Sequence, residues 1–157
     1  MAKTLILGLG NDILSDDAIG PKLVYQLEQE LKNHGVIFKT SALGGLEIVE
    51  MIRDFSKVLI IDAIRTKDGV PGSVYHFTPD NFNETLHISS FHDVSFLTAL
   101  ELAKKVDFES PSSIEIIAVE IIEDLEFSNE FSPQISEKYD SIYKEVKQYV
   151  FSFLQNS

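Results

Sequence analysis

Apolar and polar positions along the chain follow two alternating patterns. Continuous apolar runs stand at residues 4–9 (TLILGL) and 57–64 (KVLIIDAI), as is typical of strands buried on both faces of a sheet. Between these runs an apolar residue recurs at every fourth position, which predicts a helix with one buried face. The residues of this stripe are Ile19, Leu23, Leu27 and Leu31.

The rest of the chain continues this alternation of strands and helices. Further strands are predicted at residues 36–41, 72–79 and 113–121, and further helices at residues 46–55, 91–105 and from Pro133 onward. The last helix has Ser132 in the N-cap position and a proline at its first helical position, both of which favour a helix start.

One connection in this order is too short for a parallel crossover. Only seven residues, 65–71, separate strand 57–64 from strand 72–79, whereas a crossover between parallel strands needs about a dozen or more. The fourth strand is therefore predicted to run antiparallel to the third. The predicted fold is α/β, a three-layer α/β/α sandwich with a mostly parallel five-stranded sheet and one antiparallel strand, in a single domain over residues 1–157.

Charge and composition exclude several kinds of partner and site. The formal net charge is −12 at pH 7 and no run of Lys or Arg opposes it, which argues against nucleic acid or a membrane surface as partner. The chain has no cysteine, so any metal ligand is a His, Asp or Glu side chain. No membrane-length apolar segment or signal-peptide pattern is seen, and we expect a cytoplasmic, monomeric protein.

Polar residues follow the predicted strands where parallel α/β sheets gather their ligands, at the carboxyl edge. The loop after the first strand contains Asn11, Asp16 and Asp17. An aspartate before a helix is most often an N-cap or a favourable partner of the helix dipole, and this alternative stays open for Asp17. One aspartate is enough to cap a helix, however, so the pair indicates an additional role.

Asp62 stands inside the most strand-like segment of the chain. It follows VLII, where a buried carboxylate is disfavoured and costs free energy unless it is paired. Ionisable groups buried at strand ends are frequently site residues, which favours a functional role. The alternative is an aspartate that accepts hydrogen bonds from neighbouring loop amides.

His92 is the candidate imidazole. In SSFHDVSF, Ser90 and Asp93 match a capping box and place His92 in the first turn of a helix, where the dipole favours the neutral, metal-binding ring. The alternative is a surface histidine in a cap. His87 is a rival in the same loop, whereas His76 and His34 are expected to be structural or solvent-facing.

Together, two carboxylates and a neutral imidazole suit zinc or nickel, with coordination positions left for water or substrate. Other chemistries lack their motifs. Gly8 and Gly10 begin a dinucleotide fingerprint, but Ile13 stands where the third glycine belongs, and there is no Walker loop or Gly-x-Ser-x-Gly elbow.

The quoted segments, in their order, resemble the nickel-iron hydrogenase maturation endopeptidases. LGLGNDILSDDAIG resembles the family's opening Gly-x-Gly-Asn motif with its paired acids, LGGLE its Gly-Gly turn, LIIDAI its strand with Asp-Ala, and SSFHDVSF its Ser-x-His segment. The resemblance implies an endopeptidase that removes the C-terminal extension of a hydrogenase large-subunit precursor after nickel insertion. It implies that Asp17, Asp62 and His92 contact the nickel and carry out catalysis, while Asp16 orients the loop or caps the helix.

Nickel, on this resemblance, is carried by the substrate and held by the precursor's cysteines, so that the isolated protein can be metal-free. Two positions depart from the family pattern: Ala42-Leu43 replaces an acid before the Gly-Gly turn, and residues 118–121 (AVEI) replace Gly-x-x-Pro. Two alternatives remain open. One is a non-catalytic maturation factor that binds a metal-loaded partner, and the other is a different small metal-dependent peptidase.

Overall fold

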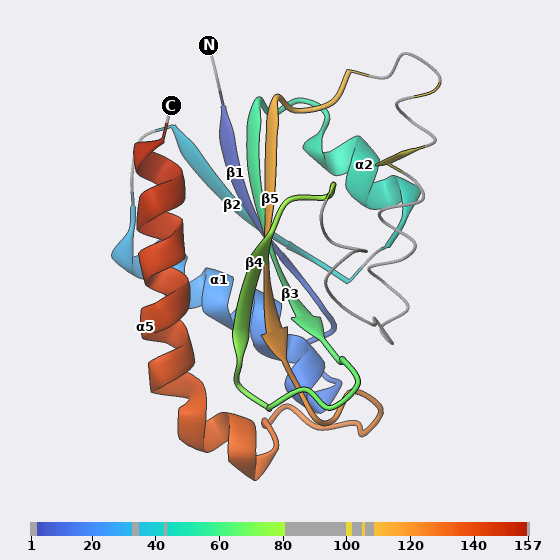
Figure 1. Ribbon diagram of the computed structural model, residues 1–157, viewed down its shortest axis with the longest axis vertical. Helices are drawn as coiled ribbons and strands as arrows, with labels where there is room; N and C mark the ends of the chain where they lie inside the picture. The colour runs from blue at the N-terminus through green and yellow to red at the C-terminus, as the bar shows by residue number, and fades with distance from the viewer. Residues whose placement is uncertain are drawn as a thin grey trace.

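The computed structural model describes residues 3–32, 35–42, 44–80, 100–101, 105 and 109–156. Its centre is a five-stranded sheet with the strand order β2-β1-β3-β5-β4 (Figure 1). The strands are β1 (Thr4–Leu9), β2 (Val36–Ser41), β3 (Lys57–Ile64), β4 (Val74–Phe77) and β5 (Ser113–Glu120). All neighbouring pairs are parallel except β4–β5, which is antiparallel. The predicted mixed sheet is confirmed.

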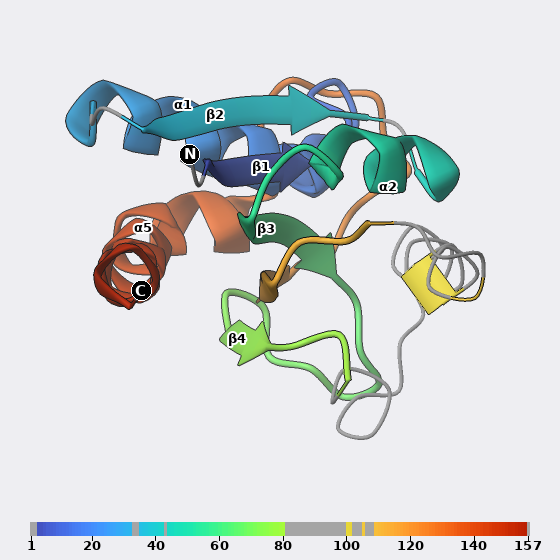
Figure 2. The same ribbon diagram turned by 90° about the horizontal axis from the view of Figure 1, so that it is seen from above.

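Helices cover both faces of this sheet. A short 3₁₀ helix, η1 (Ser15–Ala18), leads into α1 (Ile19–Glu30), and the other helices are α2 (Leu46–Ile52) and α5 (Pro133–Gln155). Helices α1 and α5 lie on one face and α2 on the other, which gives the predicted three layers (Figure 2). Of the helix predicted at residues 91–105, only Leu100, Glu101 and Lys105 are described, and all three are helical.

Two separate cores explain the continuous apolar runs. Successive side chains of a strand point to opposite faces. In β1, Leu5 and Leu7 therefore pack on the face covered by α2, and Ile6 packs on the face covered by α1 and α5. A strand covered on both faces needs apolar residues at nearly every position, and β1 and β3 have them except at Thr4, Lys57 and Asp62.

The structure corrects the predicted bounds of α2 and β4, and it ends β5 at Glu120, one residue before the predicted end. Helix α2 ends at Ile52, three residues before the predicted end, and a turn closed by the Phe55 amide on the Ile52 carbonyl follows it. Strand β4 is limited to residues 74–77 because it is an edge strand whose pairing with β5 stops at Phe77. None of the helices within the described ranges is both long and apolar enough to cross a lipid bilayer.

Candidate active site at the carboxyl edge of the sheet

The sheet has a topological switch point between β1 and β3. From β1 the chain passes through α1 to β2 on one side, and then through α2 to β3 on the other side of β1. In open α/β sheets, ligands bind at the carboxyl ends of the strands at this point, because the two connections leave in opposite directions and open a crevice. Asp17 follows β1 and Asp62 lies in β3, so the two predicted carboxylates flank the switch point.

Glycines bring the first loop close to the strand ends. A Cβ atom on Gly10, whose φ is +145°, would stand 2.0 Å from the Asp17 carbonyl oxygen. A Cβ atom on Gly8 would stand 2.6 Å from the Gly20 carbonyl oxygen at the start of α1. The glycines therefore allow a tight exit of the chain from the sheet, which holds the 3₁₀ helix η1 against the end of β1.

Asp17 lies in η1 and is 8% exposed. Its Oδ2 accepts a hydrogen bond from the Asn11 backbone N–H at 2.8 Å, which ties the carboxylate to the point where the chain leaves β1. The N-cap position of α1 is occupied by Ala18 and not by Asp17. The N-cap interpretation of Asp17 is therefore wrong, because η1 is inserted between the loop and α1.

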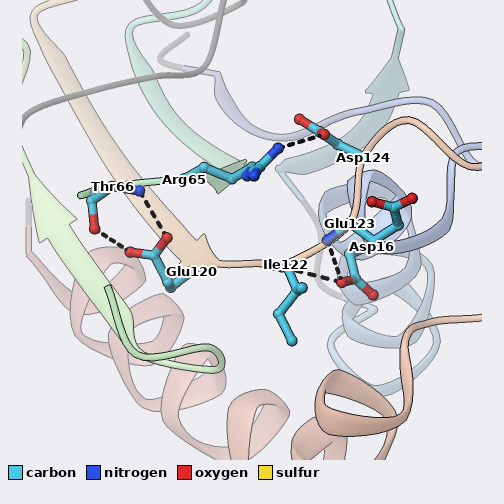
Figure 3. Close-up of polar contacts among 7 residues, drawn as sticks. All are labelled: Asp16, Arg65, Thr66, Glu120, Ile122, Glu123 and Asp124. Atoms are coloured by element: carbon cyan, nitrogen blue, oxygen red, sulfur yellow. Dashed lines mark hydrogen bonds and ion pairs between the residues drawn. The ribbon is translucent and has the colours of Figure 1, made fainter. Parts of the chain in front are cut away.

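Asp16, the neighbouring residue, is fully buried and has a different environment. Its Oδ2 accepts hydrogen bonds from the backbone N–H groups of Ile122 (3.2 Å) and Glu123 (3.0 Å), as Figure 3 shows, and from the Ser132 hydroxyl (2.8 Å). Its Oδ1 accepts the Ser132 backbone N–H at 2.7 Å. Asp16 thus fastens the loop after β1 to the loop between β5 and α5, in agreement with its predicted orienting role.

Asp62 is 4% exposed and lies on the face of β3 that also carries Ile60 and Ile64, toward α2. Its Oδ1 accepts the backbone N–H of Ala63 at 2.8 Å. Pairing between β1 and β3 ends at Gly8 and Ile61, so Asp62 is the first residue of β3 beyond its paired stretch with β1. The expected burial of a carboxylate near the end of this strand is confirmed.

The histidines divide into described and undescribed residues. His92, together with its rival His87 and with His34, lies outside the described residues, and its assignment stays a prediction. His76 lies in β4, where its Nε2 is 2.5 Å from Glu115 Oε1 and its ring stacks on Tyr149 at 5.1 Å between centroids. These contacts agree with the structural role predicted for His76.

No group of three His, Asp or Glu side chains that could hold a metal occurs within the described ranges. The structure brings Asp17 and Asp62 to one edge, and the third predicted ligand, His92, belongs to the segment outside those ranges. Asp17 Oδ2 and Asp62 Oδ1 each accept a backbone N–H, and such a bond orients the carboxylate.

Glu120 is a buried acid at this edge that the sequence reasoning did not single out. It is 2% exposed at the end of β5 and lies within the stretch that departs from the family pattern. Its carboxylate accepts hydrogen bonds from the Thr66 backbone N–H (2.8 Å), the Thr66 hydroxyl and the Tyr75 hydroxyl (3.1 Å), two of them drawn in Figure 3. Burial raises the pKa of Tyr75, and the nearby Glu120 carboxylate adds to the rise. The sequence carried a signal for it, since Glu120 follows a run of apolar residues at the end of a strand, much as Asp62 follows VLII.

A sequence model of the family described as "Hydrogenase maturation protease" matches residues 21–149. The chain belongs to this family. Membership agrees with the predicted enzyme class, a hydrolase of the endopeptidase type, and it confirms the family that the motifs resembled.

Individual members of the family show how far the similarity extends. The chain is 33% identical over 73 residues, 46% of its length, to the Hydrogenase 2 maturation protease of Escherichia coli (strain K12), and the matched part spans 44% of that protein. It is 24% identical over 153 residues to the hydrogenase expression/formation protein HupD of Thiocapsa roseopersicina, covering 95% of this chain and 68% of that one.

Among solved structures, the hydrogenase maturating endopeptidase HybD from E. coli superposes with a TM-score of 0.75 at 23% identity. The alignment covers 96% of this chain and 93% of that chain. At this identity the similarity shows that the two chains share a fold.

Proposed function

We propose that this chain removes the C-terminal extension of a nickel-iron hydrogenase large-subunit precursor after nickel has been inserted. The observation that carries the proposal is the placement of Asp17 and Asp62, two buried carboxylates at the switch point of a hydrogenase maturation protease fold. The names of the relatives in E. coli and T. roseopersicina, both tied to hydrogenases, support a hydrogenase precursor as the substrate.

Nickel in this proposal is part of the substrate, held by the precursor's own cysteines. The absence of cysteine from this chain agrees with that division. Asp17, Asp62 and His92 contact the precursor's nickel, so that productive binding requires the metal. Carboxylate oxygen and neutral imidazole nitrogen are suitable ligands for this ion. The backbone N–H groups of Asn11 and Ala63 hold the two carboxylates in place for this contact.

The reaction is the hydrolysis of one peptide bond. A water oxygen attacks the scissile carbonyl carbon while Asp17 or Asp62 takes one of its protons, and the proton passes to the departing amide nitrogen as the C–N bond breaks. A carboxylate at this position must be ionised to act as a base. Both aspartates are buried and oriented, which favours proton transfer from the one water that attacks when bound substrate excludes bulk solvent.

The test uses the purified chain with its own organism's large-subunit precursor, prepared with and without inserted nickel, and measures product masses. A single C-terminal cut that requires nickel supports the proposal. Binding that depends on nickel without any cut would instead indicate a non-catalytic maturation factor. Cutting that depends on a metal bound tightly to the isolated chain would indicate a different small metallopeptidase.

A further inference from the structure

Three large apolar side chains are exposed beside Asp17 although they lie on well-fixed backbone. Ile13 is 53% exposed, Leu125 is 78% exposed and Phe127 is 80% exposed. Ile13 belongs to the loop after β1, and the other two belong to the loop between β5 and α5. We refer to these three residues as the docking rim.

The two loops that carry the docking rim are joined by backbone hydrogen bonds. The Ser128 N–H donates to the Ile13 carbonyl and the Ser15 N–H donates to the Ser128 carbonyl, both at 2.9 Å. The Asp16 N–H also donates to the Glu123 carbonyl at 3.0 Å. Figure 1 shows the loop after β5 running beside the amino end of α1, where the first loop ends. Phe127, next to Ser128, is therefore fixed to the same short segment as Asp17.

Exposed apolar side chains on a fixed backbone favour binding of a partner at the docking rim. Burying a large apolar side chain on association gains free energy, and a preformed backbone avoids the entropic cost of ordering a loop. Exposed aromatic side chains on rigid backbone are typical anchors of protein interfaces. Because the docking rim is fastened to η1, an occupant held there is also positioned relative to Asp17.

The loops that carry the docking rim are acidic, which favours a basic binding partner. Residues 121–131 (IIEDLEFSNEF) contain four acids and no Lys or Arg, and the loop 11–18 contains three acids and no base. The bases that reach these loops in the described structure are Lys22, which donates to the Asn129 carbonyl, and Arg65, which pairs with Asp124. A complementary surface therefore has an apolar side chain flanked by Lys or Arg.

We infer that the docking rim binds an apolar segment flanked by basic residues on the large-subunit precursor, next to the bond that is cut. This inference rests on the proposed function and adds to it the surface that recognises the protein part of the substrate. Nickel contact and docking then contribute separately to substrate recognition. Nickel contact makes binding depend on a loaded precursor, and docking holds the precursor's backbone at the carboxyl edge of the sheet.

The test compares Leu125→Ser and Phe127→Ser with Phe151→Ser, an exposed aromatic on α5 near the opposite end of the sheet. Phe151 is 43% exposed, and Phe153 two residues later has its carbonyl bound by Lys57 at the start of β3. We expect each docking-rim variant to raise the Kd and the KM for nickel-loaded precursor about tenfold, with kcat within about twofold of the unaltered chain. We expect Phe151→Ser to change neither constant, and Glu126→Gln to flatten the dependence of KM on salt.

The outcomes separate this inference from the proposed function. If the unaltered chain cuts the precursor and the docking-rim variants bind like Phe151→Ser, the inference fails alone. If the chain binds nickel-loaded precursor without cutting it, and Phe127→Ser weakens that binding, the docking-rim inference is supported and the peptidase proposal fails. If neither binding nor cutting occurs, both fail. Self-association of the chain that Phe127→Ser abolishes, with KM unchanged, would assign the surface to a second copy and overturn the inference.

Discussion

Two kinds of buried carboxylate lie at the same edge of the sheet. Asp16 and Glu120 accept hydrogen bonds from segments distant in sequence, Asp16 from residues 122, 123 and 132, and Glu120 from Thr66 and Tyr75. Asp17 and Asp62 accept the hydrogen bonds described above from their own vicinity, the backbone N–H groups of Asn11 and Ala63. The first pair fastens loops together, and the second pair is held in place at the switch point.

Burial alone does not separate an acid that fastens loops together, here a scaffold acid, from a proposed site acid. All four side chains are less than 9% exposed, and Asp16 and Asp17 are adjacent in the chain. Asp16 and Glu120 are distinguished by donors that come from segments distant in sequence. A carboxylate with several distant donors stabilises the fold through charge-assisted hydrogen bonds, and replacing it leaves those donors unpaired in the interior.

The largest effect is expected where the site acids lose their charge. Asp17→Asn, Asp62→Asn and His92→Gln should each lower the rate of precursor cleavage by about 10²–10⁴-fold, because the base or a nickel contact is lost. Asp140→Asn, an exposed aspartate on α5, is the matched control and should cut normally. Product masses over time measure the rate, and denaturant unfolding confirms an intact fold. Normal cutting by all three variants would refute the assignment.

Asp16→Asn should act on stability first. The carboxamide of the introduced asparagine has one acceptor oxygen for the four donors of Asp16, so at least one buried donor loses its acceptor. We expect a loss of about 3 kcal/mol in the free energy of unfolding. Urea denaturation measures it, with Asp12→Asn expected within about 0.5 kcal/mol of the unaltered chain. A variant as stable as the control would mean that the clamp between the two loops contributes nothing.

Glu120→Gln, at the end of β5, tests the second of the two acids that fasten loops together. One of its two acceptor oxygens becomes an amide facing Thr66 or Tyr75, and we expect a loss of about 2 kcal/mol of unfolding free energy. Cleavage by the folded variant should stay within a few-fold of normal. The exposed Glu126→Gln is the stability control. A drop in kcat comparable to that of Asp62→Asn, in a folded protein, would move Glu120 from the scaffold acids to the site acids.

The smallest effect concerns an acid far more exposed than either pair. Hydrogen bonds from Lys147 and Tyr143 lower the pKa of Glu30, which links α1 to α5. A lowered pKa in the folded state stabilises the protein above the ordinary glutamate pKa, and this contribution is lost as the pH falls through the lowered value. Glu30→Gln should therefore make the unfolding free energy slightly less dependent on pH between neutral and strongly acidic solution. Identical pH profiles of the two proteins would show that the link is too exposed to matter.

The sequence predicted the strands β1, β2 and β3 with their observed bounds. For β1 and β3 the signal was a nearly continuous apolar run, as a strand buried on both faces requires, whereas β2 is an edge strand and only partly buried. It also predicted the antiparallel β4, since a chain of seven residues cannot make a parallel crossover. Sequence pattern alone did not place the end of α2 or the extent of β4, which depend on a turn and on an edge pairing.

For the site, the sequence by itself determined which residues can do chemistry: an aspartate pair after a glycine exit, an aspartate inside an apolar strand, and a family whose members are proteases. Only the tertiary structure decided how each member of the pair is held. Asp16 and Asp17 have the same chemistry and neighbouring positions, but the turn of η1 points Asp16 toward Ser132 and the β5–α5 loop and Asp17 toward Asn11. That direction depends on long-range packing, which no local pattern contains.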